Sequence, residues 1–118
     1  MNLGEAIDAV EETYEFMLAY AAQGRRTEDA DATGGIRASL KRADAGLAVI
    51  SESALPEAGA FLDIVRGDAG KASAGIGLVL AQSDITSQLI DNLNASIHLR
   101  ALLTDLFLLD EALKIHPA

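Results

Sequence analysis

The sequence has no cysteine, no tryptophan and only two prolines. Without cysteine there is no disulfide framework and no thiolate metal site, which fits a reducing compartment. The first residues lack a basic segment followed by an apolar run, so a secretory signal is not expected. The longest stretch without charge, residues 72–83, is too short to span a bilayer. We therefore expect a cytoplasmic protein with no membrane partner.

Basic residues are also scarce. Nine lysines and arginines face eighteen aspartates and glutamates, for a formal net charge of -9. Nucleic-acid binding depends on clustered basic side chains, so we expect no nucleic-acid partner. An acidic balance aids solubility and can steer basic partners, but it assigns no function by itself.

Short aliphatic residues dominate what is present. Half of the 118 residues are hydrophobic and only 4% are aromatic. Alanine and leucine are the strongest helix formers, and the length suits one domain with its own core. The composition therefore predicts a single all-α domain over residues 1–118.

Apolar residues recur at spacings of three and four in four segments. The pattern predicts helices over about 3–22, 36–53, 57–81 and 85–115, with Ser83 or Asp84 capping the last one. Charged residues and a glycine pair make 25–35 the expected flexible loop. Four such helices with short connections favour an antiparallel, up-down four-helix bundle.

Small residues line one face of the third segment, at Gly67, Gly70, Ala74, Gly77 and Ala81. Each glycine in a helix interior costs about 1 kcal/mol relative to alanine. We expect a continuous helix whose glycines are compensated by close packing against a neighbour. The alternative is a break between Gly67 and Gly70.

The last segment is apolar almost all round between residues 99 and 109. A helix with this pattern is buried on every side, and a small chain cannot easily cover one of its own helices completely. A second copy of the chain can cover the remaining apolar surface, so we expect a homodimer. The expected interface residues are Leu99, Leu102, Leu106, Leu109, Gly70 and Gly77.

Acidic residues form a stripe on the first helix, opposite its apolar face. Carboxylate di-metal bundles combine glutamates with Glu-x-x-His pairs that project inward, and no such pair occurs here. A solvated face is therefore the expected role of this stripe, without a bound metal. Its members are Glu5, Asp8, Glu11, Glu12 and Glu15.

Arg100 is the most interesting charge. Helical spacing places it among apolar residues of the last segment, where a cation must be paired or reach water. An ion pair with a neighbouring helix or subunit is the expected role, and an anion-binding pocket with His98 and Tyr14 is the alternative. A phosphate-loop interpretation of residues 66–73 fails, because the required first glycine and the Ser or Thr after Gly-Lys are missing.

No arrangement of nucleophile and base emerges from the sequence, and none of its motifs requires a cofactor. We expect a non-enzymatic interaction or regulatory protein that acts through an apolar helix surface, with a protein partner or a second copy. The alternative is a small-molecule-binding or enzymatic helical bundle whose pocket lies near Arg100.

Overall fold

The computed structural model describes residues 1–28 and 35–116. Over these residues the chain forms five α-helices and one short 3-10 helix, and it has no strand. The all-α class is therefore confirmed. The elements are α1 (Leu3–Ala21), α2 (Ile36–Glu52), η1 (Pro56–Ala58), α3 (Phe61–Leu80), α4 (Ser87–Asn94) and α5 (Ile97–Leu113). No described helix is both long and apolar enough to cross a membrane.

The first two helices lie close to the ranges expected from the sequence. Asn2 caps α1 through a reciprocal pair of hydrogen bonds with Glu5, in which each side chain accepts from the other residue's backbone N–H. After α1 the chain turns at Gly24, whose φ of 64° is the left-handed conformation that glycine adopts without strain. Most of the expected loop 25–35 lies outside the described residues.

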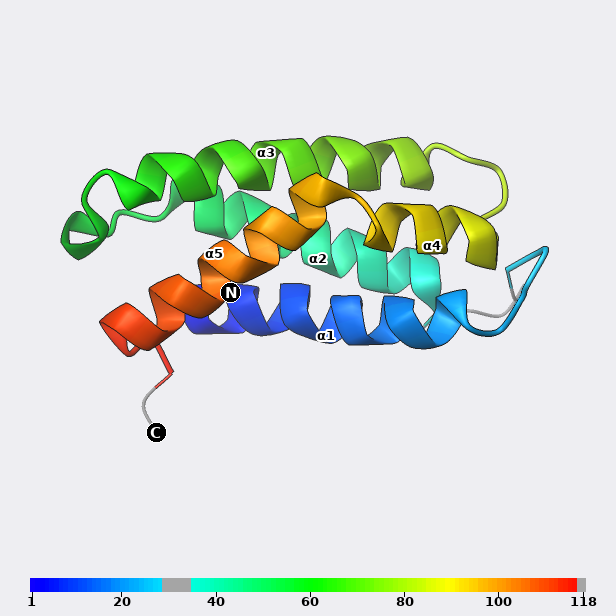
Figure 1. The fold of residues 1–118 in the computed structure, drawn as a ribbon, viewed down its shortest axis with the longest axis horizontal. Coiled ribbons are helices and arrows are strands. Elements are labelled where there is room, and N and C mark those ends of the chain that lie inside the picture. The colour runs from blue at the N-terminus through cyan, green and yellow to red at the C-terminus, as the bar shows by residue number, and fades with distance from the viewer. Residues whose placement is uncertain (29–34, 117–118) are drawn as a thin grey trace.

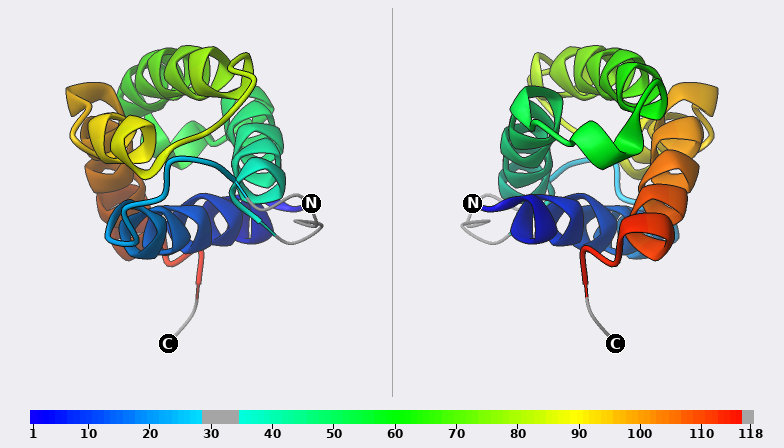
Figure 2. Two further views of the ribbon diagram at one scale, coloured as in Figure 1. Left: turned by 90° about the vertical axis from the view of Figure 1, so that its right-hand side faces the viewer. Right: turned by 90° about the vertical axis from the view of Figure 1, so that its left-hand side faces the viewer.

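The helices surround one apolar core. α1 packs mainly against α2 and α4, whereas α3 packs against α2 and α5 (Figure 1). Seen end-on, α1, α2 and α3 take three sides of the core, and α4 with α5 takes the remaining side (Figure 2). Fully buried members of the core come from every helix and include Ile7, Met17, Leu40, Leu47, Ile76, Ile90 and Leu106.

The expected third helix begins later than predicted. Pro56 starts the short η1, and Gly59, with φ of 57°, separates it from α3. From Phe61 onward α3 is continuous through all its glycines, so the alternative break at Gly67 to Gly70 does not occur. Within the chain no close packing compensates Gly67, Gly70 and Gly77, where an added Cβ would meet nothing within 4 Å.

The expected single helix over 85–115 is instead two helices. Thr86, not Ser83 or Asp84, caps α4 by accepting from Leu89 N–H at 3.0 Å. α4 ends at Asn94 and the chain is extended at Ser96, with ψ of 126°. Asparagine and serine are weak helix formers, because their side chains compete for backbone hydrogen bonds. The break lets α4 pack along α1 while α5 crosses to α3.

This break also shifts the apolar register that the sequence predicts. In one unbroken helix, apolar spacing would place Leu93, Ile97, Leu103 and Phe107 on a single buried face. Leu93 and Leu103 do face the core, but Ile97 and Phe107 are 73% and 57% exposed. A helix that starts anew after a bend need not continue the face of the one before it. The buried face of α5 is formed by Leu99, Leu102, Leu103, Leu106 and Leu109.

Candidate functional site

None of the described pockets is lined by Arg100, His98 or Tyr14, the residues of the alternative anion site. Arg100 and His98 are exposed on α5, while Tyr14 is half-buried on α1. The Arg100 side chain has no hydrogen bond or ion pair with any residue in the described part of the chain, so the expected ion pair within the chain is absent there. Because this guanidinium reaches water, its charge needs no buried partner.

The expected interface residues fall into two groups. Leu99, Leu102, Leu106 and Leu109 lie in the chain's own core, at most 3% exposed. A partner can reach them only if the core opens, so the surplus apolar surface that we assigned to them lies elsewhere. Gly70 and Gly77, by contrast, lie on the exposed face of α3.

Ser87 joins the start of α4 to the end of α1 and the turn that follows it, more than sixty residues earlier in the sequence. Its hydroxyl donates to the Tyr20 carbonyl at 2.7 Å and accepts from the Arg25 backbone N–H at 2.7 Å. Its own N–H donates to the Arg25 carbonyl at 2.9 Å. The Tyr20 hydroxyl donates to the Ile85 carbonyl at 2.5 Å, so the end of α1 and the start of α4 are fixed together.

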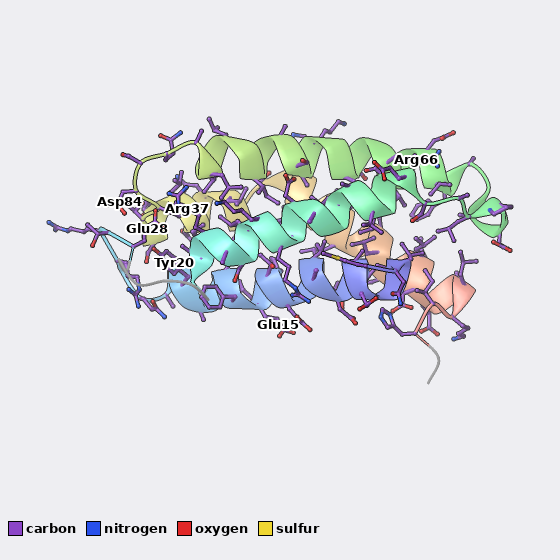
Figure 3. The ribbon with its side chains drawn as sticks, turned by 180° about the vertical axis from the view of Figure 1, so that it is seen from behind. Glu15, Tyr20, Glu28, Arg37, Arg66 and Asp84 are labelled. Atoms are coloured by element: carbon purple, nitrogen blue, oxygen red, sulfur yellow. The ribbon has the colours of Figure 1, made fainter. Side chains whose placement is uncertain are left out.

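Arg37 and Glu28 extend this network toward α2 and α3. One guanidinium nitrogen of Arg37 lies 2.5 Å from a Glu28 oxygen, and this hydrogen bond raises the pKa of Arg37. The same guanidinium donates to the carbonyls at the end of α3, at positions 80 and 82. Glu28 N–H in turn donates to Asp84 at 2.8 Å. Figure 3 shows Tyr20, Glu28, Arg37 and Asp84 gathered at one end of the molecule.

We call these contacts the polar junction, comprising Tyr20, Arg25, Glu28, Arg37, Asp84, Ile85 and Ser87. Sequence reasoning missed it, because its members come from four separate segments and follow no periodic pattern. Of the basic residues at the start of α2, Arg42 pairs with Glu12 of α1 at 2.7 Å, whereas Arg37 pairs with Glu28 of the loop.

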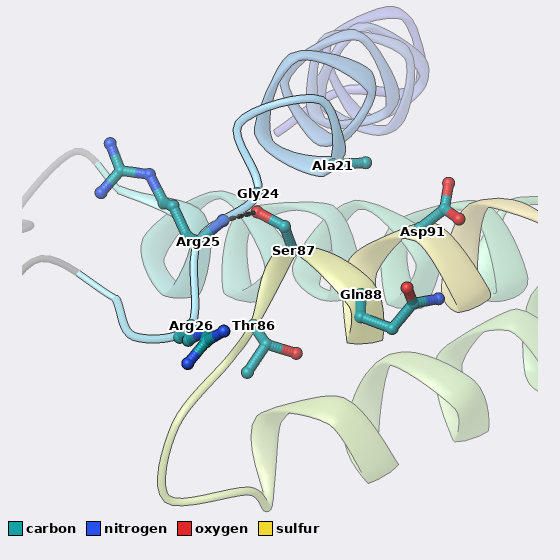
Figure 4. Close-up of a pocket in the computed structure, with 8 residues that line it drawn as sticks. All are labelled: Ala21, Gly24, Arg25, Arg26, Thr86, Ser87, Gln88 and Asp91. Carbon is teal, nitrogen blue, oxygen red and sulfur yellow. Dashed lines mark hydrogen bonds between the residues drawn. The ribbon is translucent and has the colours of Figure 1, made fainter.

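A hollow of about 460 Å³ opens beside the polar junction, between Gly24 to Arg26 and the first turns of α4 (Figure 4). Ser87 lies at its base, held by the hydrogen bonds described above. Arg26 and Asp91 lie at different sides of it, and Thr86 and Gln88 lie between them. Its lining therefore carries both signs of charge, with Arg25 and Arg26 as cations and Asp91 as the anion.

At the opposite end, His116 binds the chain after α5 back to α1. Its Nδ1 lies 2.8 Å from Asp110, while its Nε2 lies 3.1 Å from both Asp8 and the Gly4 carbonyl. The chain reverses at Lys114, a non-glycine residue with φ of 53°. We call this arrangement the His116 clasp. The sequence alone does not indicate this arrangement, because the partners of His116 lie on α1 and α5.

The clasp shifts the pKa values of its members. The hydrogen bond with Asp110 raises the pKa of His116, and the charges of Asp110 and Asp8 add to this effect. Burial acts to raise the pKa of Asp110, but the hydrogen bonds and charge of His116 outweigh it and the pKa is lowered. For Glu11, burial and the charges of Asp110 and Asp8 raise the pKa.

Asp68 of α3 and Asp105 of α5 bring two carboxyl groups together where these helices pack. Burial, a hydrogen bond with Asp68 and the charge of Asp68 raise the pKa of Asp105 to about 7. The hydrogen bond requires one of the two groups to be protonated. When both are ionised, Asp105 Oδ2 is buried without a donor among the described residues. The pair is thus a point of electrostatic strain in the α3–α5 contact.

No group of three His, Asp or Glu side chains within residues 1–28 and 35–116 is placed to hold a metal ion. The acidic residues of α1 do not converge on one point; Glu12 pairs with Arg42, and Asp8 contacts His116. Comparison with known proteins finds no match to a family model, a curated protein or a solved structure.

Proposed function

We propose that this chain is a non-enzymatic helical interaction protein that forms a homodimer through the outer surface of α3 and α5. The apolar side chains that remain exposed carry the proposal. Five of the eight large exposed ones belong to these two helices: Ile64, Leu78, Ile97, Phe107 and Leu108. Each is more than half exposed, and contiguous exposed apolar surface is characteristic of interaction sites.

The side chains are arranged so that a partner can contact both helices. Leu108 and Phe61 line one shallow groove between α5 and the start of α3, and Ile64 follows Phe61 by one turn. Ile97 lies on the same face of α5 as Leu108, three turns earlier. A partner seated on this face would cover apolar residues of both helices.

The glycine face of α3 supports close approach. Gly67, Gly70 and Gly77 have open space where a Cβ would stand, and they alternate with exposed Ala74 and Ala81 at helical spacing. Within the chain nothing offsets the helix-forming cost of these glycines. A second helix lying over this face would offset it by packing directly against the backbone.

Charge favours a second copy as the partner. The chain carries a net charge of -9, but the charged residues of α3 sum to zero and alternate in sign along it: Asp63, Arg66, Asp68 and Lys71. Asp68 lies against Asp105 of α5, so Asp63, Arg66 and Lys71 are the exposed charges of this helix. Two copies of α3 in antiparallel orientation, as in a two-fold symmetric dimer, can therefore bring the exposed acid of one copy near the exposed bases of the other.

We also propose that the fold is an antiparallel four-helix bundle. α4 and α5 together take the place of the fourth helix of an antiparallel four-helix bundle, since they complete the side between α1 and α3. The cytoplasm is the proposed location, in keeping with a chain that contains no cysteine.

Light scattering on the wild type and on Leu108→Glu tests the proposal. Leu108 is 57% exposed, so a charge there leaves the monomer's core intact but is costly within an apolar interface. We expect a wild-type dimer that becomes a monomer in the variant, with an unchanged helical circular dichroism spectrum. Leu106 is unsuitable for this test, because it is fully buried.

Leu18→Glu is the matched control. Leu18 is 49% exposed but lies on α1, away from the proposed interface, so this variant should remain dimeric. A monomeric wild type at about 100 μM, far above the dissociation constants of stable dimers, would refute self-association. A dimer that both variants preserve would refute the assignment to α3 and α5.

A further inference from the structure

The hollow beside the polar junction has the features of a binding site. Its volume of about 460 Å³ lies within the range of small-molecule sites. Its base is ordered by the buried Ser87, which bonds Tyr20 and Arg25 at distances between 2.7 and 2.9 Å. A site built on such fixed backbone is largely pre-formed and needs little reorganisation on binding.

Two arginines line the hollow, Arg25 and Arg26. The Arg25 side chain extends away from Gln88 and Asp91 in the close-up, which leaves Arg26 as the cationic group of the hollow (Figure 4). Its guanidinium has no hydrogen bond or ion pair with another side chain in the described part of the sequence. Arg37 and Arg42, by contrast, are paired with Glu28 and Glu12. The Arg26 side chain lies near Thr86 in the close-up (Figure 4). A guanidinium in this position can bind a carboxylate or another oxyanion through paired N–H donors.

Asp91 is the anionic group, and it restricts which ligands fit. It lines the same hollow from the second turn of α4, on the far side of Gln88 from Arg26 (Figure 4). A simple anion bound to Arg26 would be repelled by this carboxylate, and a simple cation bound to Asp91 would be repelled by Arg26. A molecule carrying both charges satisfies both residues.

We propose that this hollow binds a small zwitterionic molecule, whose anionic group is bound by Arg26 and whose cationic group is bound by Asp91. The Gln88 side-chain amide donates to Asn92 at 3.0 Å, so its carbonyl oxygen remains available to accept a bond from the ligand's ammonium group. The Thr86 oxygen accepts from Leu89 N–H, which leaves the hydroxyl hydrogen for the ligand's anionic group. The proposal does not depend on dimer formation, because the site lies on α4 and the loop before α2.

A series of ω-amino acids of increasing length provides the test. We would titrate 4-aminobutyrate, 5-aminopentanoate and 6-aminohexanoate into the protein and follow the backbone amide signals by NMR. We expect one length to bind about tenfold more tightly than hexanoate or hexylamine, which each carry one charge. The largest shifts should occur at Gly24, Arg26, Gln88 and Asp91.

Variants locate the contacts. Arg26→Gln and Asp91→Asn should each reduce affinity for the best ω-amino acid about tenfold, because each removes one charge contact. Arg100→Gln is the matched control, since it also removes an exposed arginine without a partner, and it should not change the affinity. Unchanged thermal melting in all three variants would show that the effects are local.

Other outcomes overturn the proposal. Equal binding of hexanoate and the ω-amino acids would indicate a plain anion site, in which Asp91 has no part. Shifts that are scattered over the surface, or absent at about 10 mM ligand, would show that the hollow is not a site for this class of molecule.

Discussion

Nδ1 of His116 lies 2.8 Å from Oδ2 of Asp110, six residues earlier in the chain. The backbone N–H of His116 donates to the other oxygen of the same carboxylate, also at 2.8 Å. Asp110 thus holds both the backbone and the ring of His116. The ring is left pointing at Asp8 and Gly4 of α1, so protonation of one histidine strengthens contacts between the two ends of the described chain.

The clasp predicts a pH-dependent stability. The raised pKa of His116 contributes stability that is fully present below its unfolded value of about 6.5 and is lost as the pH rises through the folded value. The lowered pKa of Asp110 contributes stability above its unfolded value of about 3.9, which is lost as the pH falls. We expect His116→Gln to lower the melting temperature most at about pH 5.5, and much less at about pH 8.5.

His98→Gln serves as the control, because it removes the other histidine of the chain, which is exposed on α5. Its effect on melting should be small and should not differ between the two pH values. If His116→Gln lowers the melting temperature by the same amount at both pH values, the clasp makes no contribution through its charge.

The Asp68–Asp105 pair also predicts that stability falls as the pH rises, but for a different reason. Because the pKa of Asp105 is raised to about 7, the folded state holds a proton between about pH 4 and pH 7 that the unfolded state releases. Stability from this group therefore falls as the pH rises from about 4 to about 7 and levels off above that. Asp105→Asn should raise the melting temperature most at about pH 8, where the wild type carries two facing carboxylates, and less at about pH 5.

The reciprocal variant Asp68→Asn tests the same contact from α3. It should also stabilise the protein at high pH, because either amide can donate to the remaining carboxylate. Asp63→Asn changes an exposed acid of the same helix outside the pair, and it should not reproduce the effect. If the effect came only from the net charge of the protein and not from the contact between Asp68 and Asp105, all three variants would change the melting temperature alike.

Replacing Asn94 by an apolar residue should increase the stability of the folded state. The residue is 8% exposed, and neither atom of its amide has a hydrogen-bond partner among the described residues. A buried polar group without a partner costs about 1–3 kcal/mol. Asn94→Leu has a similar volume and needs no partner, so we expect a higher midpoint in urea unfolding, with an unchanged slope. A lower midpoint would indicate that the amide is satisfied by a bound water molecule.

Periodicity was sufficient to predict the all-α class, because apolar spacing determines which face of a helix can be buried. It gave the wrong register after residue 94, since a face can be extrapolated only while a helix is unbroken. The bend at Asn94 to Ser96 exposed Ile97, and it allowed the leucines of α5 to be buried without a partner. The two residues between α4 and α5 thus decide which apolar side chains of α5 are buried and which are exposed.

The sites were harder to predict than the helices. The polar junction and the His116 clasp each join residues from segments that are far apart in the chain, and most of their bonds involve a backbone group. Backbone acceptors have no signature in the sequence. Arg100 attracted attention because it interrupts an apolar pattern, whereas Arg26 lies in a polar loop, where an arginine is unremarkable until the fold brings Asp91 near it.

The glycine that packs most closely against a neighbouring helix is Gly46, and it is not one of the α3 glycines that stand out in the sequence. The conspicuous glycines of α3 have open space around them, whereas Gly46 of α2 is buried against α1, and a Cβ there would lie 2.8 Å from the Ala6 carbonyl oxygen. Backbone cannot move aside as a flexible side chain can, so Gly46→Ala must separate α1 from α2 and should cost about 1–3 kcal/mol in unfolding free energy. Gly67→Ala is the matched change on an exposed helix face, where the better helix propensity of alanine should stabilise the monomer by about 1 kcal/mol. Urea unfolding of both variants measures the two effects. Opposite signs are expected, and a neutral Gly46→Ala would show that α1 and α2 do not approach as closely as this contact requires.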